Sequence, residues 1–284
     1  MDIIDSHCHV LSEDTAAYPL APLGGKQSVW AAERPVTADG LLARMDTVGI
    51  ARAVLVQATT AYGYDNSYVV DSARRHPDRF AAVGTVDPLA EGAADGLRSA
   101  TDKGLAGVRL FTNGSTVSEQ GLWFAEAATD PFWAAAAETG IPVCLQLKLG
   151  EDTTPVLVDL LERHPRAVIL LDHCGYPDVS GDLATAAEPL VALATNPGLH
   201  LKLTHRTLEG LDAAGASAGE FLNPVVSAFG SDRIAWGSNC PAAAQPLDEL
   251  FALAGRVLSV VSEDARQDIL GNTARRLYPT LAPS

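Results

Sequence analysis

The sequence predicts a single (β/α)8 barrel, or TIM barrel, in the α/β class, with residues 1–284 forming one domain. Three observations lead to this fold class. The chain has 284 residues of which 47% are hydrophobic, short apolar runs alternate with helix-like segments, and eight such runs can be counted. A barrel of this class uses about 250 residues, and alternating strands and helices are typical of a parallel sheet.

The eight runs lie at fairly regular intervals, and residues 11–36 between the first two are expected to form a loop. A doubly wound open sheet is the alternative that the pattern leaves open. The predicted strands are Ile3–His7, Ala53–Gln57, Phe80–Val86, Gly107–Leu110, Pro142–Leu147, Ala167–Leu171, His200–Leu203 and Arg233–Gly237.

Helix start and stop signals lie between these strands. Asp130 is expected as an N-cap before Pro131 at the first helical position, and Gly140 stands where that helix should end. The sequence Arg-His-Pro occurs at 75–77 and again at 163–165, each time between a helix-like segment and a strand. This repeat favours βα units in series.

The formal net charge of -15 argues against nucleic acids and anionic membrane surfaces as partners, because both are repelled by an acidic protein. An anionic small molecule needs a local group of cations, which Arg109 and Lys202 could supply. The sequence shows neither a signal peptide nor a membrane-spanning run. Its four cysteines show no CxxC spacing and are expected to be reduced, as in a cytoplasmic protein.

The barrel prediction sorts the seven histidines, because catalytic groups lie at the carboxyl ends of barrel strands. His76 and His164 end helices and His200 begins a strand, so these three belong at the opposite end. The histidines at or just beyond strand ends are His7, His9, His173 and His205.

Residues 5–9, with the sequence Asp-Ser-His-Cys-His, end the first predicted strand. The period of two places His7 and His9 on one face, where a pair of imidazoles suits either a metal site or acid–base chemistry. His173 leaves a strand at the same end and is expected to complete a cluster of three. A histidine bonded to nearby backbone is the structural alternative for His173.

Further polar residues are predicted to line a substrate pocket. Arg109 ends the fourth strand and presents a planar fork suited to a carboxylate or a developing oxyanion. The other pocket candidates are Lys202 and Thr204 on one face of the seventh strand, Gln57 and Gln146 at the ends of the second and fifth, and Tyr62, Tyr64, Asn66 and Trp30 in loops. Salt bridges or hydrogen bonds within the barrel are the alternative roles, and His205 is expected to face away from Lys202.

Seven segments taken together resemble amidohydrolase family 2, in particular its lactonase-like branch of sugar-acid lactonases and 2-pyrone-4,6-dicarboxylate lactonase. The segments, in chain order, are DSHCHV, LVQATTAYGYDNSYV, GVRLF, LLDHCGYP, LKLTHR, DRIAWGSNCP and ILGNTARRLYP. The resemblance implies a catalytic or metal-binding set of His7, His9, His173 and the residue at position 239. It also implies an aspartate at that last position, where this chain has Asn239.

This departure matters because an amide is neither a general base near pH 7 nor a good metal ligand. The resulting hypothesis is a hydrolase that opens a lactone or related cyclic ester of a small polar or carboxylated molecule. Water would be activated by the histidines, either with Zn²⁺ or another divalent metal on His7, His9 and His173, or in a metal-free site. A decarboxylase or other lyase of the same family, and a ligand-binding barrel that has lost its base, are the alternatives.

Overall fold

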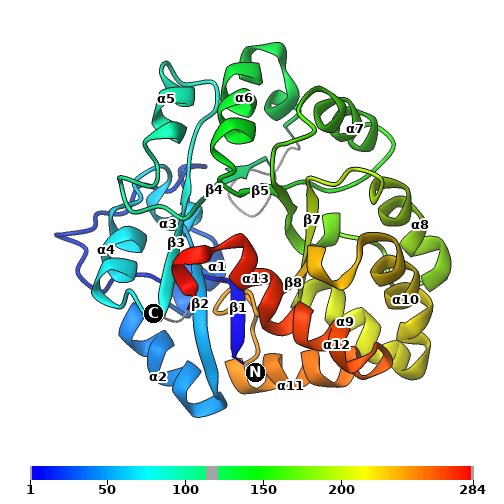
Figure 1. The fold of residues 1–284 in the computed structure, drawn as a ribbon. Helices are drawn as coiled ribbons and strands as arrows, with labels where there is room; N and C mark the ends of the chain where they lie inside the picture. The colour runs from blue at the N-terminus through cyan, green and yellow to red at the C-terminus, as the bar shows by residue number, and fades with distance from the viewer. Residues whose placement is uncertain (1, 113–120, 283–284) are drawn as a thin grey trace.

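Eight parallel strands form the centre of the molecule, which confirms the predicted barrel (Figure 1). The computed structural model describes residues 2–112 and 121–282. Each strand pairs with the next one along the chain, and every predicted run is a strand whose ends differ by three residues or fewer. The strands are β1 (Ile3–Cys8), β2 (Ile50–Val56), β3 (Phe80–Thr85), β4 (Gly107–Phe111), β5 (Val143–Gln146), β6 (Ile169–Leu171), β7 (Leu199–Thr204) and β8 (Ile234–Gly237).

Helices surround the strands on the outside (Figure 1). The predicted stop signals are confirmed: α4 and α7 end at Arg75 and Arg163, and Gly140 caps α6 with a left-handed φ of 68°. Asp130 is the first residue of α6, and Thr129 takes the N-cap position predicted for Asp130. The helices are α1 (Val29–Glu33), α2 (Ala38–Val48), α3 (Thr59–Tyr62), α4 (Ser67–Arg75), α5 (Ala93–Arg98), α6 (Asp130–Thr139), α7 (Thr153–Arg163), α8 (Leu183–Leu193), α9 (His205–Ala214), α10 (Ala218–Phe229), α11 (Leu247–Val257), α12 (Glu263–Gln267) and α13 (Thr273–Leu277).

Two apolar clusters form the core. The larger one fills the space between strands and helices, and the smaller one lies inside the barrel around Ile4, Val54 and Leu170. The smaller cluster includes Tyr278 and Leu281 from the carboxyl-terminal segment, which packs against the amino-terminal part of β1. This segment therefore closes the amino ends of the strands and leaves the carboxyl ends available for a site.

Asp5 joins the first and last strands where the barrel closes. Its carboxylate accepts hydrogen bonds from the backbone N–H of His7 (3.0 Å), from the backbone N–H of Ser238 (2.9 Å) and from the Ser238 hydroxyl. Two backbone bonds continue the seam, from the Asn239 N–H to the His7 carbonyl (2.7 Å) and from the His9 N–H to the Cys240 carbonyl (2.8 Å). This seam sets the relative position of His7, His9 and Asn239.

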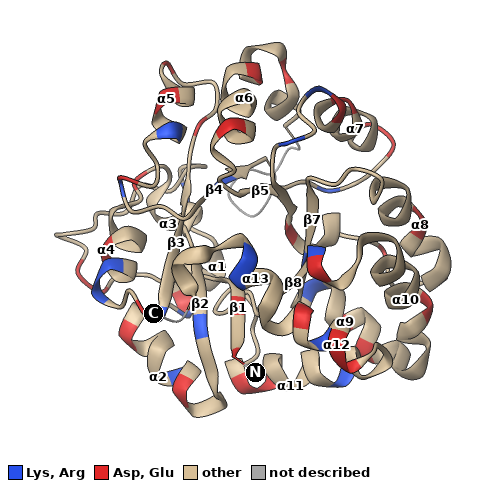
Figure 2. Cartoon of the chain, viewed as in Figure 1, with Lys and Arg blue, Asp and Glu red and all other residues tan. Residues whose placement is uncertain are grey.

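The outer helices carry many of the acidic side chains, spread over several elements (Figure 2). His76 and His164 lie at helix ends and pair with Asp39 (2.8 Å) and Asp130 (3.1 Å), in keeping with the structural role expected for them. All four cysteines are buried and free. Across residues 2–112 and 121–282, no helix combines the length and the apolar character needed to cross a membrane.

Replacing Asp5 with alanine removes the acceptor of three buried donors. We expect Asp5→Ala to lower the free energy of unfolding by about 3 kcal/mol, since each buried donor left without a partner costs about 1–3 kcal/mol and neighbouring losses are not additive. Urea unfolding measures the change. Asp95→Ala, which removes an exposed partner of Arg98, is the control and should cost no more than about 1 kcal/mol. Equal losses in the two variants would show that Asp5 does not secure the seam.

Candidate active site at the carboxyl ends of the strands

A pocket of about 290 Å³ opens at the carboxyl ends of the strands. Three of its side chains are cationic, and none of the described residues that line it is Asp or Glu, although the chain as a whole is strongly acidic. The lining residues are His9, Trp30, Ala58, Thr59, Thr60, Arg109, Phe111, Gln146, Lys148, His173, Tyr176, Arg206, Asn239 and Ala242. The pocket therefore favours a ligand that carries negative charge.

His9 follows β1 and is held on both sides of its ring. Its Nδ1 lies 2.8 Å from the Val56 carbonyl oxygen, and its ring stacks on Trp30 with the centroids 5.2 Å apart. Because a carbonyl only accepts hydrogen bonds, Nδ1 carries the proton and Nε2 keeps its lone pair. Burial lowers the pKa of His9 to about 4, so the ring is neutral near pH 7. His9 thus presents a basic nitrogen to the pocket.

Asn239 lies beside this nitrogen, with its side-chain Oδ1 3.2 Å from His9 Nε2. An amide oxygen only accepts, so with Nδ1 protonated both facing atoms carry lone pairs, and a hydrogen bond between them requires the amide to be turned so that its NH₂ faces Nε2. Asn239 has a left-handed φ of 59°, which asparagine tolerates better than most residues. The turn after β8 therefore presents an amide, not a carboxylate, to the histidine cluster.

His7 lies beneath the pocket and is fully buried. Its ring centroid is 5.0 Å from that of His9 and 5.2 Å from that of His173, so the three predicted histidines are close together. His7 Nδ1 lies 3.4 Å from Lys202 Nζ and 3.5 Å from Asp172 Oδ1, and its Nε2 has no hydrogen-bond partner. Burial lowers the pKa of His7 well below its usual value, which keeps the ring neutral.

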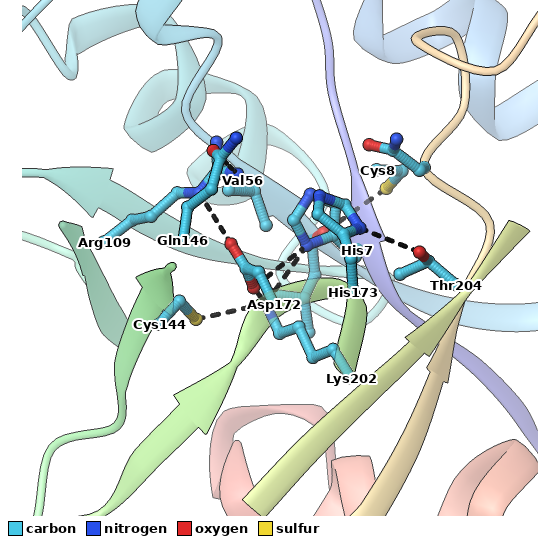
Figure 3. Close-up of polar contacts among 12 residues, drawn as sticks. His7, Cys8, Val56, Arg109, Cys144, Gln146, Asp172, His173, Lys202 and Thr204 are labelled. Atoms are coloured by element: carbon cyan, nitrogen blue, oxygen red, sulfur yellow. Dashed lines mark hydrogen bonds and ion pairs between the residues drawn. The ribbon is translucent and has the colours of Figure 1, made fainter. Parts of the chain in front are cut away.

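Asp172 is the centre of the buried charges (Figure 3). Its carboxylate lies 2.9 Å from Arg109 Nε and 3.5 Å from Lys202 Nζ, and the side chains of Asp172 and Lys202 are fully buried. Burial on its own raises the pKa of Asp172, but Lys202, Arg109 and His7 together hold it well below the usual value. The carboxylate is therefore ionised; its Oδ2 accepts from Arg109, and its Oδ1 has ion-pair contacts with Lys202 and His7 but no hydrogen bond.

His173 leaves β6 in a turn, η3 (Asp172–Gly175), whose backbone is left-handed at His173 (φ 57°) and Cys174 (φ 53°). The turn directs the ring toward Thr204 on β7, whose hydroxyl oxygen is 2.7 Å from His173 Nδ1 (Figure 3). Burial lowers the pKa of His173 well below its usual value. A Thr204 hydroxyl that donates to Nδ1 places the proton of the neutral ring on Nε2, which can then donate to a ligand, whereas the reverse arrangement leaves Nε2 as an acceptor.

Arg109 connects the pocket wall to the buried charges. Besides Asp172 it donates to the Gln146 side-chain oxygen, and Gln146 in turn donates to the Tyr176 hydroxyl over 2.9 Å. Two of the five N–H groups of Arg109 are used in these bonds, and the guanidinium also lines the pocket. The fork predicted for Arg109 is thus held in one orientation by protein acceptors.

Seven of the predicted pocket or ligand-cluster residues do not line the pocket, namely His7, Gln57, Tyr62, Tyr64, Asn66, Lys202 and Thr204. Lys202 is turned into the barrel, where it contacts Cys144 Sγ at 3.0 Å, and His7 lies beside it. The Gln57 amide donates to the Asp65 carbonyl, which turns it away from the cleft. Tyr64 is 45% exposed and is not among the residues that line the pocket. Thr204 acts on His173 and does not line the pocket itself.

Several site residues were not predicted. These residues are Asp172, Tyr176 and Arg206. Asp172 directly precedes His173, Tyr176 lies three residues after it, and Arg206 follows His205, so each one is close in sequence to a predicted site residue. Arg206 places its guanidinium 5.8 Å from the Tyr176 ring centroid. Their positions depend on the turn after β6 and on the start of α9, which the apolar pattern does not reveal.

Within the described ranges, no three His, Cys, Asp or Glu side chains are arranged to hold a metal ion. His9 offers Nε2 alone, because its Nδ1 is bonded to Val56, and Nε2 faces the Asn239 amide. Lys202 brings a positive charge to 3.4 Å from His7. The predicted metal ligands are therefore adjacent, but among the described residues their donor atoms do not converge on one point.

Comparison with known proteins gives relatives that match this chain over nearly its whole length. An L-fucono-1,5-lactonase from Burkholderia ambifaria is 26% identical over 261 residues, which are 88% of this chain and 86% of the relative. Two solved structures share the fold. One, from Pseudomonas putida and described as a 2-pyrone-4,6-dicarboxylic acid hydrolase, has a TM-score of 0.76 at 23% identity, with 99% of each chain covered.

The other solved structure is an amidohydrolase from Burkholderia multivorans with bound zinc. It has a TM-score of 0.73 at 24% identity and covers 98% of this chain and 99% of its own. The family model for amidohydrolases matches residues 4–280, and this chain therefore belongs to the amidohydrolase family.

Proposed function

We propose that the protein hydrolyses a lactone or related cyclic ester of a small anionic molecule. The observation that carries the proposal is the pocket itself, in which two neutral imidazoles and an amide face three cations without a carboxylate among the described lining residues. The 26% identity to an L-fucono-1,5-lactonase supports a lactone as the substrate. We also propose that the partner is this small molecule rather than a nucleic acid or a membrane, and that the protein is cytoplasmic.

The chemistry needs a proton acceptor for water and donors for the carbonyl oxygen. His9 Nε2 is the acceptor in this proposal, because the Val56 carbonyl fixes the tautomer that leaves its lone pair in the pocket. A water molecule would bind on the pocket side of His9 Nε2 and the neighbouring Asn239 amide, and the amide would orient it. The water oxygen then adds to the lactone carbonyl carbon while its proton passes to His9.

The negative charge that develops on the carbonyl oxygen would be stabilised by His173 and Arg109. His173 Nε2–H is oriented by Thr204, and the Arg109 guanidinium is oriented by Asp172 and Gln146. Preorganised donors of this kind stabilise a transition state because they need no reorientation during the reaction. Collapse of the adduct breaks the ring C–O bond, and the proton on His9 moves to the leaving alkoxide, which opens the lactone.

We infer that this reaction does not require a metal on His7, His9 and His173. A divalent metal held by histidines needs ligand nitrogen or oxygen atoms that are deprotonated and have a free lone pair. The Asn239 amide lies against the free nitrogen of His9, and the family-type carboxylate at position 239 is missing. The relative with bound zinc shows that the fold can accommodate an ion elsewhere in the family. We propose that the residue at position 239 determines whether this protein uses a metal ion.

A panel of sugar-acid lactones and carboxylated lactones tests the proposed activity, with acid release measured at constant pH. Because the pKa of His9 is lowered to about 4, its basic form is complete well below neutral pH. We expect kcat/KM to be level from about pH 5 to about pH 8 and to fall below about pH 4. His9→Gln should lower it by about 100-fold or more.

Three results of the panel would contradict this proposal in different ways. Binding without turnover of any lactone would indicate a ligand-binding barrel, and release of CO₂ from an aromatic carboxylate would indicate a decarboxylase. A fall of kcat/KM centred near pH 6.5 would show that the base is an exposed histidine and not His9.

Arg109 gives a second prediction, on the charge of the substrate. Arg109→Lys keeps the charge beside Asp172 but loses the planar fork, and we expect kcat/KM to fall roughly 30-fold or more, equivalent to about 2 kcal/mol. Arg109→Ala should have a larger effect. Arg98→Lys, in an exposed ion pair, is the control and should leave kcat/KM unchanged. Less than a threefold change in both Arg109 variants would rule out a carboxylate contact.

Position 239 gives a third prediction, on metal affinity. Asn239→Asp adds a negative charge and a good oxygen ligand beside His9 Nε2, so we expect Zn²⁺ to bind at least about tenfold more tightly than to the wild type. Competition with a chromogenic chelator measures the affinity, and Asn239→Ala is the control without a carboxylate. If all three proteins bind zinc equally, the side chain at position 239 does not determine metal binding.

A further inference from the structure

A second hollow adjoins the proposed active-site pocket. This groove has a volume of about 580 Å³ and lies between the loop after β5, the turn after β6 and helix α8. It shares two lining residues with the pocket, Lys148 and Tyr176, so these side chains stand between the two spaces. A substituent that extends from a ligand in the pocket past Lys148 and Tyr176 would lie in the groove.

The floor of the groove is apolar. Cys174 and Leu190 are 2% and 1% exposed and form its base, and Ala186 is half-buried beside them. The remaining apolar lining residues are Leu149, Pro177 and Pro189. The two loops are held together by a bond from the Leu149 N–H to the Gly175 carbonyl (2.9 Å), which keeps the groove in one shape.

The charges of the groove are opposite to those of the pocket. Glu151, Asp178 and Asp182 lie among its lining residues and are exposed, and among the described lining residues Lys148 at the junction is its one cation. An acidic rim over an apolar floor disfavours a second anionic group. It favours a neutral apolar chain, whose burial is worth about 0.8 kcal/mol for each methylene.

Tyr176 stands at the boundary in a fixed orientation. Its hydroxyl accepts from Gln146 (2.9 Å), and its ring centroid lies 4.9 Å from that of His173 and 5.8 Å from the Arg206 guanidinium. Its backbone is left-handed, with φ 57°. The Tyr176 ring is thus held in place by contacts on its pocket side. Its position defines where a substituent of the substrate would enter the groove.

We propose that the groove binds an apolar substituent of the substrate, so that the protein acts on lactones that carry an alkyl or aryl chain. This inference rests on the proposed function, because it assigns the groove to the same ligand. It makes Ala186 and its neighbours on α8 determinants of specificity that do not touch the reacting atoms.

Binding of straight-chain carboxylates, from butanoate to octanoate, tests the groove without requiring turnover. With the carboxylate in the cationic pocket, we expect calorimetric titration of the wild type to show affinity rising about fourfold for each added methylene. Ala186→Glu places a charge on the groove floor and should abolish the increase. Ala184→Glu is the matched control, since Ala184 is exposed on the same helix and does not line the groove.

The melting temperature of each variant shows whether it is folded. If Ala186→Glu does not fold, Thr185→Glu replaces it, because Thr185 lines the groove but is exposed and tolerates a charge. Affinity that is independent of chain length in the wild type, or an unchanged increase in the folded groove variant, would overturn the proposal.

A series of lactones with alkyl chains from methyl to hexyl separates this proposal from the proposed function. Turnover with kcat/KM rising with chain length supports both. Turnover with a kcat/KM that does not change with chain length supports the proposed hydrolysis and contradicts the proposal that the groove binds the chain. Carboxylate affinity that rises with chain length, without turnover of any lactone, supports the groove and contradicts the hydrolase.

Discussion

The buried carboxylate of Asp172 is the interaction on which the arrangement of the site depends. It lies between Arg109, Lys202 and His7, at distances of 2.9, 3.5 and 3.5 Å. Moving charges out of water is costly, and removing one partner of such a buried group costs about 3–5 kcal/mol because the other charge is left uncompensated. The strands β1, β4 and β7 are therefore tied to the turn after β6 at the level where the pocket begins.

This constraint also explains why Arg109 is suited to recognise a ligand. A long flexible side chain would lose about 2 kcal/mol of rotamer entropy when a ligand immobilised it. In this protein Asp172 and Gln146 have already fixed the guanidinium. The free edge of the fork meets the pocket together with Lys148 and Arg206, so a local positive region exists inside a protein of net charge -15. The overall charge consequently says little about the charge of the substrate.

The amide at position 239 changes the balance of the histidine cluster. A carboxylate there would favour protonated imidazoles or a bound cation. Asn239 adds no charge, and burial leaves His9 neutral, with its tautomer fixed by the Val56 carbonyl, as it does His7 and His173. The negative charge close to the cluster comes from Asp172 on the opposite side, where it is already balanced by Lys202 and Arg109. In the proposed mechanism the cluster therefore acts as a set of hydrogen-bonding groups.

The sequence by itself determined the barrel, the end of the barrel that holds the site, and the approach of His7, His9 and His173. These features follow from the period of the apolar pattern and from the rule that parallel strands share one carboxyl edge, both of which are local or topological. Gln57, Lys202 and Thr204 do not line the pocket, because a place near a strand end indicates which edge a residue occupies but not how its side chain turns. Tyr62, Tyr64 and Asn66 do not line it either, because a sequence says little about the path of a loop.

Only the tertiary structure decided that Lys202 lies inside the barrel, that Asp172 joins the buried charges, and that Tyr176 separates the pocket from the groove. Each of these depends on contacts between residues far apart in the sequence and on left-handed backbone in the turn after β6. Such contacts form because buried polar groups must find partners wherever the packed strands bring them, and no short-range pattern records that choice.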